Sequence, residues 1–474
     1  MFSCIKSTIT TTGIQYKKIA LILLTAITAC FILPSYTTLS PQGVRMVVIF
    51  LTAMVGIIFE VCHQILWLFL MIVIASATGT VSANSCFSGF TNIVPWLLFA
   101  VLSVSSVITS TTLGLRLAYF FMKKFGHSVW GLSYSIAFTE LLVAPVLPSN
   151  TARAASIGLP LATSLSKYIS SNVPGVSEKA IGRYLSIFYS FCNTISSGLF
   201  YTAMISNALI PEITSSAGIK FTWFSWFKYM VIPYSIILLL IPIVLKYLCG
   251  LKVGTLGKLQ QQAKENYEQL GIISNKEKII LSIFGCMLIL WILAEYIHIP
   301  VLTTTLLGLC TLVFLGILNM KTVLSNYNAF NSMMLLGILI SLVNCLVSTG
   351  VIDWFNSFIS NRLTGLSVNT SFILLTTIYF FAQFFFTGES AKIVALYAPF
   401  FTTGITIGIN PMMLAITLAS FSSASDFLAT YVCPTSLTMA STGYISLQKW
   451  LKCGISMSII FLLVWYLYAY FIWM

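Results

Sequence analysis

Charged side chains are scarce in this sequence: Asp, Glu, Lys and Arg make up only 7 % of its 474 residues. Soluble domains usually carry about 25 % charged residues, so an ordinary water-soluble protein is excluded. At the same time 58 % of the residues are hydrophobic, and a chain this apolar is not disordered in water. Long apolar runs span a membrane as helices. The composition therefore predicts an all-α polytopic membrane protein.

Residues that build metal centres and catalytic triads are scarce as well. The three histidines, His63, His127 and His298, are far apart in the chain. The 11 cysteines show no CxxC spacing, and most lie in apolar runs, where cysteine behaves as a small hydrophobic residue. A zinc site, a Ser-His-Asp triad and a disulfide framework are therefore not expected. A membrane-embedded enzyme, the alternative from another class, would need such a constellation.

Positive charge predominates, with 24 Lys and Arg against 11 Asp and Glu. Most of the cations lie at the ends of apolar runs, which is typical of cytoplasmic loops of membrane proteins and not of a nucleic-acid-binding patch. Lys6, Lys17 and Lys18 place the N-terminus in the cytoplasm, whereas Lys449 and Lys452 precede the last run and place the C-terminus outside. We therefore expect a multi-pass protein of the inner (plasma) membrane with an odd number of crossings and no nucleic-acid partner.

Apolar runs recur along the chain. Their lengths and their Pro and Gly interruptions predict about 11 to 13 crossings together with broken or re-entrant segments. One charged stretch, residues 251–278, predicts a cytoplasmic linker with a short helix near Gln260–Leu270. We divide the chain into an N-terminal cytoplasmic segment with the first membrane helix (1–43), a first membrane repeat (44–250), the linker (251–278) and a second membrane repeat (279–474).

A short motif occurs once in each half. Residues 149–153 read SNTAR and are followed by Pro160, and residues 388–392 read GESAK and are followed by Pro399. Both motifs end in hydroxyl, Ala and cation, and in both a proline stands seven residues after the cation. Transporters are often built from two inverted repeats that hold the substrate between broken helices. The motifs therefore predict inverted repeats with re-entrant hairpins.

The first motif offers groups that could replace the water around an anion. Arg153 can bind a carboxylate through two parallel hydrogen bonds, and a charge at membrane depth indicates a functional site, unless it reaches the membrane surface as an anchor. Ser149, Asn150 and Thr151 add hydroxyl and amide groups. These can bind substrate, and they can also cap the half-helix that carries Arg153.

Four stretches, in order, resemble the divalent anion:sodium symporter family, and within it the branch of citrate/tartrate carriers and plastid 2-oxoglutarate/malate translocators. They are residues 88–92 (SGFTN), 143–153 (VAPVLPSNTAR), 386–397 (FTGESAKIVALY) and 441–445 (STGYI), the last followed by Trp450 and Gly454. The resemblance extends along nearly the whole chain.

The resemblance implies a secondary active transporter of di- and tricarboxylates, of the malate, 2-oxoglutarate, succinate, citrate or tartrate class. Family members are homodimers in which a transport domain moves against a scaffold domain, an elevator mechanism of alternating access. They work by sodium-coupled symport or by anion exchange. The implied partners are a carboxylate anion, the lipid bilayer and a second subunit, with Na⁺ as the one cofactor to consider. A carrier of another anion, such as sulfate, on the same fold is the alternative.

The resemblance also extends the set of site residues. The predicted substrate-binding residues are Ser149, Asn150, Thr151, Arg153, Gly388, Glu389, Ser390, Lys392, Thr435 and Ser436. The predicted sodium ligands are Asn150, Asn193, Ser196 and Gly198. The last three lie in an otherwise apolar stretch, and small residues there are equally typical of a helix-packing face.

The second motif departs from the family pattern, which is usually SNT in sodium symporters. Glu389 and Lys392 are three residues apart, and on one helix they could form an internal ion pair. Alternatively, Lys392 is a fixed positive charge near the substrate that partly replaces a second sodium ion, which would favour exchange or proton coupling. Glu140 and Asp426 are further acids in or beside apolar runs, and the sequence assigns them no role.

Overall fold

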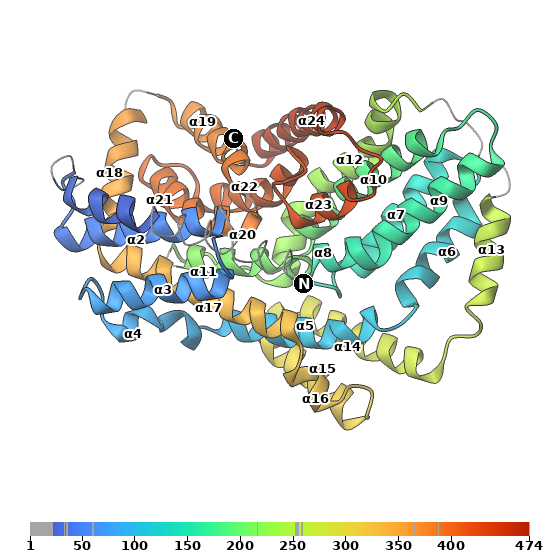
Figure 1. The fold of residues 1–474 in the computed structure, drawn as a ribbon, viewed down its shortest axis with the longest axis horizontal. Helices are drawn as coiled ribbons and strands as arrows, with labels where there is room; N and C mark the ends of the chain where they lie inside the picture. The colour runs from blue at the N-terminus through green and yellow to red at the C-terminus, as the bar shows by residue number, and fades with distance from the viewer. Residues whose placement is uncertain are drawn as a thin grey trace, which may run out of the picture.

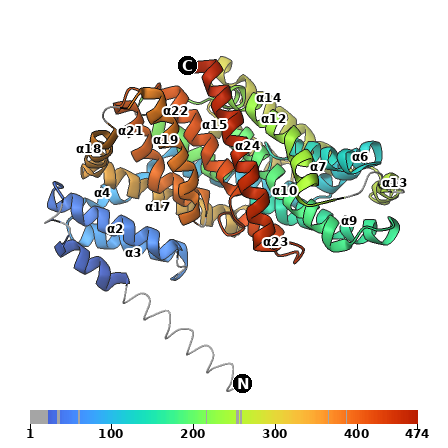
Figure 2. The ribbon, with the colours of Figure 1, turned by 90° about the horizontal axis from the view of Figure 1, so that it is seen from above.

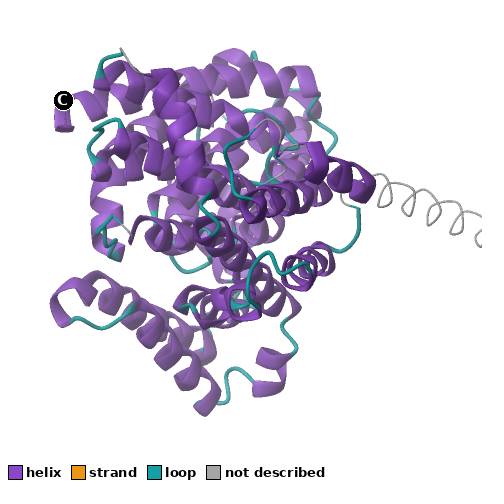
Figure 3. Ribbon diagram, turned by 90° about the vertical axis from the view of Figure 1, so that its left-hand side faces the viewer, coloured by secondary structure: helices purple, strands orange, loops and turns teal. Residues whose placement is uncertain are grey.

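The computed structural model shows an all-helical protein throughout its described part. The described residues are 22–32, 34, 37–58, 61–215, 217–251, 256, 259–363, 366–386 and 388–473. Figure 3 shows helices joined by loops, without strands among these residues. The predicted N-terminal segment with Lys6, Lys17 and Lys18 lies outside the described residues, as do the start of the first membrane helix and residues 252–255 of the linker.

Five helices of the described part are long and apolar enough to cross a membrane. They are α12 (Trp223–Leu248), α14 (Asn275–Ile297), α17 (Tyr327–Ser348), α19 (Val368–Phe381) with η6 (Ala382–Phe385), and α24 (Leu447–Trp473). A further span is possible by length if α5 (Ile93–Thr109) and α6 (Leu113–Phe125), which meet at 61°, cross together. These helices agree with the apolar runs of the sequence.

Shorter helices make up much of the remaining described part. The apolar ones are Ile22–Ile32, α2 (Pro41–Ile58), α3 (Gln64–Ala77), α7 (Val129–Val143) and α15 (Val301–Phe314). The connecting ones are α4 (Ala83–Cys86), η2 (Ser88–Thr91), α13 (Leu259–Gln269), α16 (Met320–Leu324) and α18 (Val351–Leu363). The helix predicted in the linker is confirmed as α13, which packs against α6 at one end of the molecule (Figure 1).

Helix α17 is held by a close backbone contact with the turn η2. The Gly89 N–H donates to Ser341 Oγ at 2.9 Å, and a Cβ added at Gly89 would lie 2.0 Å from the Gly337 carbonyl oxygen. Only glycine fits there, because any side chain would push η2 away from α17. The contact matters for function, since α17 also forms one wall of the cavity described below.

The two sequence motifs form the same succession of elements. In the first half, α8 (Asn150–Arg153) leads into a π-helical turn, η3 (Ala154–Gly158), and then α9 (Leu159–Asn172). In the second half, α20 (Glu389–Lys392) leads into the π-helical turn η7 (Ile393–Tyr397) and then α21 (Ala398–Thr406). In both halves a proline is the second residue of the last helix. The broken helices expected at both motifs are thus confirmed.

The break near Pro148 is built as the sequence indicates. Helix α7 ends at Val143, and α8 begins after Ser149, whose Oγ accepts from the Ala152 N–H at 3.2 Å. Such a side-chain cap satisfies an N–H that the broken helix leaves without a partner. The capping role of Ser149 is therefore confirmed.

Each motif is followed by a buried helix that ends in irregular turns. Helix α10 (Glu178–Leu199) leads into η4 (Tyr201–Ala203), η5 (Ile205–Ala208) and α11 (Leu209–Ser215). Helix α22 (Pro411–Ala424) leads into η8 (Ser425–Phe427) and α23 (Pro434–Ala440). Residues 184–209, which are mostly apolar and long enough for one span, are consequently not one continuous helix. Helix α10 packs on α22 and α12 packs on α24, so the two halves meet through matching elements. Figure 2 shows α12 and α24 close together in the middle of the molecule.

The contact between η2 and α17 predicts that Gly89→Ala destabilises the protein. Forcing a methyl group into a packed site costs about 1–3 kcal/mol, so the midpoint of thermal unfolding in detergent should fall. The matched control is Gly285→Ala on α14, where nothing lies within 4 Å of an added Cβ. Equal midpoints for the two variants would contradict the assigned contact.

Candidate functional site

The two motifs meet at one cavity, although they are far apart in the sequence. The cavity has a volume of about 160 Å³ and is lined by Ser149, Asn150 and Thr151 from the first motif and by Glu389 and Ser390 from the second. Asn150 Nδ2 donates to Glu389 Oε1 at 2.9 Å, across a separation of 239 residues. Residues of α17 form the opposite wall. The arrangement thus places both hairpin tips against one long helix.

Arg153 lies behind this cavity and is fully buried. Its Nε donates to Glu140 Oε1 at 2.6 Å and its Nη2 to Ser197 Oγ at 2.6 Å. Its Nη1 donates to the carbonyl oxygens of Leu147 and Ala203. The guanidinium is therefore engaged within the protein. A direct contact between Arg153 and a substrate, as the motif predicted, would require this network to open.

Glu140 is the acceptor at the centre of the network, a role that the sequence did not reveal. Besides Arg153, its carboxylate accepts from Asn193 Nδ2 at 2.7 Å, from the Tyr189 hydroxyl at 2.6 Å and from Ser196 Oγ at 3.3 Å. Glu140 is fully buried, and a buried carboxylate is tolerated only when such donors surround it. The one signal in the sequence was an acid within an apolar run.

The predicted sodium ligands are largely used by hydrogen bonds within the protein. Asn193 Nδ2 donates to the Asn150 carbonyl at 3.2 Å, and Ser196 Oγ donates to the Asn193 carbonyl at 2.9 Å. Asn150 Oδ1 accepts from the Thr151 N–H at 2.9 Å. The exception is Asn193 Oδ1, which is buried and has no partner among the described residues. These bonds use donor hydrogens of Asn193 and Ser196 and one lone pair of Asn150 Oδ1, so the sodium set stays a prediction.

Gly198, the fourth predicted ligand, is a packing position. Its carbonyl accepts from Trp226 Nε1 at 2.9 Å. A Cβ added here would lie 2.3 Å from Ser423 Oγ and 2.5 Å from the Tyr234 hydroxyl. Helix α10 therefore approaches α12 and α22 closely at this point, which agrees with the alternative interpretation of these small residues as a helix-packing face.

Lys392 occupies the place in the second half that Arg153 has in the first. It is fully buried, and its Nζ donates to the Phe421 carbonyl at 3.1 Å and to Ser425 Oγ. The Nζ also lies 4.8 Å from the centre of the Tyr379 ring, close enough for a cation–π interaction. Tyr379 stands thirteen residues before Lys392, as Glu140 stands thirteen before Arg153. An aromatic ring thus replaces the carboxylate of the first half.

The ion pair considered between Glu389 and Lys392 is not formed. The ion pairs within 4.0 Å among the described residues are Arg116–Glu277, Arg153–Glu140 and Lys264–Glu268. Glu389 instead accepts from Asn150 of the other hairpin and from Cys433 Sγ at 3.6 Å. Helix α20 is a single turn, and the two side chains leave it toward different tertiary partners.

Asp426 forms a second acidic group next to Glu389. A carboxylate oxygen of each residue and Cys433 Sγ all lie within 4.8 Å of one another. Asp426 is only 1 % exposed, and neither of its carboxylate oxygens has a hydrogen-bond partner among the described residues. The sequence placed Asp426 in an apolar run but gave no indication of this neighbourhood.

The remaining predicted site residues surround the cavity at different distances. Ser436 Oγ lies 3.3 Å from Ser190 Oγ and donates to the Asp426 carbonyl at 3.4 Å. Thr435 Oγ1 is buried without a partner among the described residues. Gly388 precedes α20 in extended conformation. The lining of the cavity near these residues comes from Pro434, so they support the site from behind.

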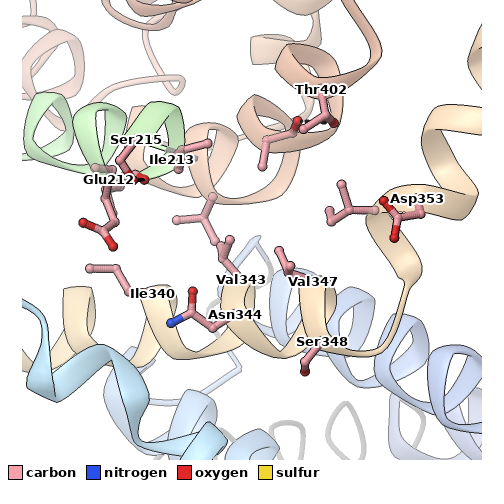
Figure 4. Close-up of a pocket in the computed structure, with 14 residues that line it drawn as sticks. Glu212, Ile213, Ser215, Ile340, Val343, Asn344, Val347, Ser348, Asp353 and Thr402 are labelled. Atoms are coloured by element: carbon pink, nitrogen blue, oxygen red, sulfur yellow. Dashed lines mark hydrogen bonds between the residues drawn. The ribbon is translucent and has the colours of Figure 1, made fainter. Parts of the chain in front are cut away.

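Two further cavities differ in the charged residues that line them. One, of about 340 Å³, shares Ser149, Thr151, Ile205 and Ser332 with the motif cavity and continues toward three asparagines near the start of α17. A larger one, of about 540 Å³, lies between α11, α17, α18 and α21. Its lining residues include two acids and no cation, and Figure 4 shows these acids, Glu212 and Asp353, at opposite ends. These two acids disfavour an anion in the larger cavity.

The fold is that of an all-helical polytopic membrane protein, with helices broken in two corresponding places around one cavity. MtrF of Neisseria gonorrhoeae aligns with a TM-score of 0.54 and 14 % identity, over 85 % of this chain and 93 % of that chain. The YdaH transporter of Alcanivorax borkumensis aligns with a TM-score of 0.53 and 13 % identity, over 85 % and 88 %. At this identity the likeness is one of fold.

The family follows from the sequence of the whole chain. The transmembrane region of sodium:sulfate symporters matches residues 15–474. The chloroplastic dicarboxylate transporter 1 of Arabidopsis thaliana is 30 % identical over 434 residues, 90 % of this chain and 78 % of the relative. The L-tartrate/succinate antiporter of Shigella flexneri is 29 % identical over 381 residues, 80 % and 78 %. The chain therefore belongs to the sodium:sulfate symporter family, which confirms the resemblance of the motifs.

The network around Arg153 predicts that Glu140→Gln is strongly destabilising. The variant keeps the size of the side chain but leaves a buried cation without its counter-charge, which costs about 3–5 kcal/mol. The measurement is the midpoint of heat-induced aggregation in detergent. The control is Glu268→Gln, whose carboxylate is 63 % exposed and 3.9 Å from Lys264, and a change there should cost less than about 1 kcal/mol. A Glu140→Gln midpoint as high as that of the control would refute the pairing.

Proposed function

We propose that this protein is a secondary active transporter of di- and tricarboxylates that works by alternating access. The observation that carries the proposal is the meeting of the two hairpin motifs at one cavity, joined there by the hydrogen bond from Asn150 to Glu389. Membrane transporters commonly hold the substrate between such broken helices. The relatives named as dicarboxylate transporters and as a tartrate/succinate antiporter support a carboxylate as the substrate.

The cavity offers neutral hydrogen-bond donors for a carboxylate. The hydroxyls of Ser149, Thr151 and Ser390 line it from the hairpins, and Ser332 lines it from α17. Hydroxyl groups can replace the water that an anion loses when it enters the membrane. Lys392 is the one buried cation among the described residues that has no carboxylate within 4.0 Å. We assign these hydroxyls to substrate binding and Lys392 to a favourable electrostatic field.

Arg153 has a different part in this proposal. It holds the first hairpin in shape through Glu140 and the carbonyl oxygens of the broken backbone. It therefore acts on the substrate through Ser149, Asn150 and Thr151, which the hairpin presents. The proposed movement is that of an elevator, in which both hairpins travel together against a scaffold that includes α17. This movement and a homodimeric assembly rest on the family resemblance.

We further place the protein in the inner (plasma) membrane as a multi-pass protein, with a cytoplasmic N-terminus and an external C-terminus. The long apolar helices support the membrane location. The orientation rests on the basic residues that precede the first and last apolar runs, because positively charged loops remain on the cytoplasmic side. Sodium-coupled symport and anion exchange are both compatible with the family.

The hydroxyl lining predicts that Ser390→Ala weakens substrate binding. A hydrogen bond to a charged group contributes about 1.5–3 kcal/mol, so the half-saturating concentration of malate in counterflow should rise by about tenfold or more. The measurement is exchange of labelled malate in proteoliposomes preloaded with unlabelled malate. The control is Ser164→Ala, an exposed serine on α9 whose hydroxyl bonds only to carbonyls of its own helix. Equal half-saturation in both variants would exclude Ser390 from the site.

The same assay tests the substrate class. Malate, succinate, 2-oxoglutarate, citrate and tartrate should compete with the label, and sulfate should not. If sulfate alone competes, the protein is instead a sulfate carrier on the same fold. Uptake that requires sodium and is indifferent to preloading would exclude anion exchange.

A further inference from the structure

We propose that Asp426 binds and releases a proton that moves together with the carboxylate substrate, and that it acts on the substrate cavity through Glu389. The inference deepens the proposed function and rests on it, because it names the ion that drives transport. It follows from the charges around the second hairpin and from the contrast between the two halves.

Glu389 presents an electrostatic difficulty for an anion carrier. It is the one ionisable side chain among the residues that line the motif cavity, and it is only 6 % exposed. The repulsion between two negative charges is strong where water is scarce. The amide of Asn150 donates to Glu389 but carries no charge. Lys392 can balance the charge of Glu389 but not that of Asp426 as well, so a carboxylate substrate needs one further positive charge here when it occupies the cavity.

Asp426 is placed to supply that cation as a proton. One of its oxygens lies within 4.8 Å of a Glu389 oxygen. Both of its oxygens lack hydrogen-bond partners among the described residues, and its side chain is buried. An ionised carboxylate in such surroundings is costly, whereas a neutral carboxyl group is not. A protonated Asp426 leaves a single negative charge on the two neighbouring carboxyl groups.

The charged and titratable groups near Asp426 come from several elements. Helix α20 contributes Glu389 and Lys392, Cys433 lies before α23, and Tyr234 of α12 is close enough to interact with its charge. Helices α10 and α24 also pack on η8 and bring aromatic rings to Phe427 next to it. With Lys392 positive and both acids ionised, the cluster carries one surplus negative charge. One proton makes it neutral.

The first half of the chain shows what a fixed arrangement looks like. Arg153 is matched there by Glu140, whose carboxylate receives donors from three further side chains. The second half has one cation, Lys392, and two carboxylates, one of which has no partner. In the second half a proton can therefore bind to a carboxylate without breaking an ion pair or a hydrogen bond. The asymmetry between two otherwise matching hairpins indicates that the extra carboxylate is there for a purpose other than holding the hairpin.

The coupling follows from this geometry. A proton on Asp426 lowers the negative charge at the cavity and raises its affinity for a carboxylate. By reciprocity, a bound carboxylate raises the affinity of Asp426 for the proton by the same factor. The protonated protein with substrate is thus the favoured loaded form, and proton and anion move in the same direction. When the proton leaves, the restored charge favours release of the anion.

The test is uptake driven by a pH gradient in sodium-free proteoliposomes of the full-length protein. The gradient runs from about pH 7 outside to about pH 8 inside, where carboxylic acids with a pKa near 4 stay ionised. One proton with a doubly ionised malate carries one net negative charge, so the membrane potential is held at zero with valinomycin and equal potassium on both sides. One proton per anion then gives about tenfold accumulation of malate. Asp426→Asn, which cannot release a proton, should show an accumulation ratio near one. Asp353→Asn, an exposed aspartate on α18, should accumulate like the unchanged protein.

A second measurement keeps the inference testable even if Asp426→Asn does not fold. A pH-sensitive dye inside vesicles with the unchanged protein should report acidification when malate is added outside. Counterflow without acidification would contradict proton coupling but remain consistent with carboxylate transport. Absence of counterflow would contradict the proposed function itself. Accumulation that follows a gradient of sodium or zinc in place of the pH gradient would assign Glu389, Asp426 and Cys433 to a metal ion and overturn the proton.

Discussion

The buried ion pair between Arg153 and Glu140 is the interaction on which the first half of the structure depends. A helix can be broken at membrane depth only if the freed backbone groups find partners. Arg153 supplies two such partners, because it donates to the carbonyls of Leu147, before the break, and Ala203, beyond the end of α10. The buried charge of Arg153 is tolerated there because Glu140 and the donors around it form a closed network of hydrogen bonds. This network holds the hairpin behind the Ser149 cap and Asn150.

The second hairpin has the same succession of helical elements, but different side chains bond to its freed backbone groups. Lys392 donates to the carbonyl of Phe421 at the end of α22 and to Ser425, while Gln383 donates to the Val432 carbonyl at 3.1 Å. The Tyr379 ring lies where the first half has a carboxylate. The Lys392 amine and the Tyr379 ring thus take the places that the Arg153 guanidinium and the Glu140 carboxylate have in the first half. Backbone geometry and charge are therefore set independently in the two halves.

Local features of the structure were predictable from the sequence, whereas the partners of the charged residues were not. The break near Pro148, the linker helix and the repeated motif depend on neighbouring residues, and the structure contains all three. The contact of Glu140 with Arg153 and Asn193 joins α7, α8 and α10, and no spacing in one sequence reveals it. Glu389 and Lys392 are three residues apart but do not pair, because α20 has a single turn and each side chain bonds to a partner from another part of the fold. Asn193 and Ser196 were predicted as sodium ligands from the family resemblance, and the structure adds that both side chains donate to Glu140.

The distribution of buried charge also explains why the cavity between the motifs, and not the larger one, suits an anion. The larger cavity has Glu212 and Asp353 in its lining and no cation to offset them. The motif cavity also has an acid, but Lys392 and a second carboxylate lie behind it. A fixed acid would exclude anions permanently. An acid whose neighbour can gain or lose a proton excludes them only in one state, and alternating access needs such a difference between loaded and empty forms. The first hairpin, with its balanced charge, can keep the shape of the site constant while the second changes its affinity.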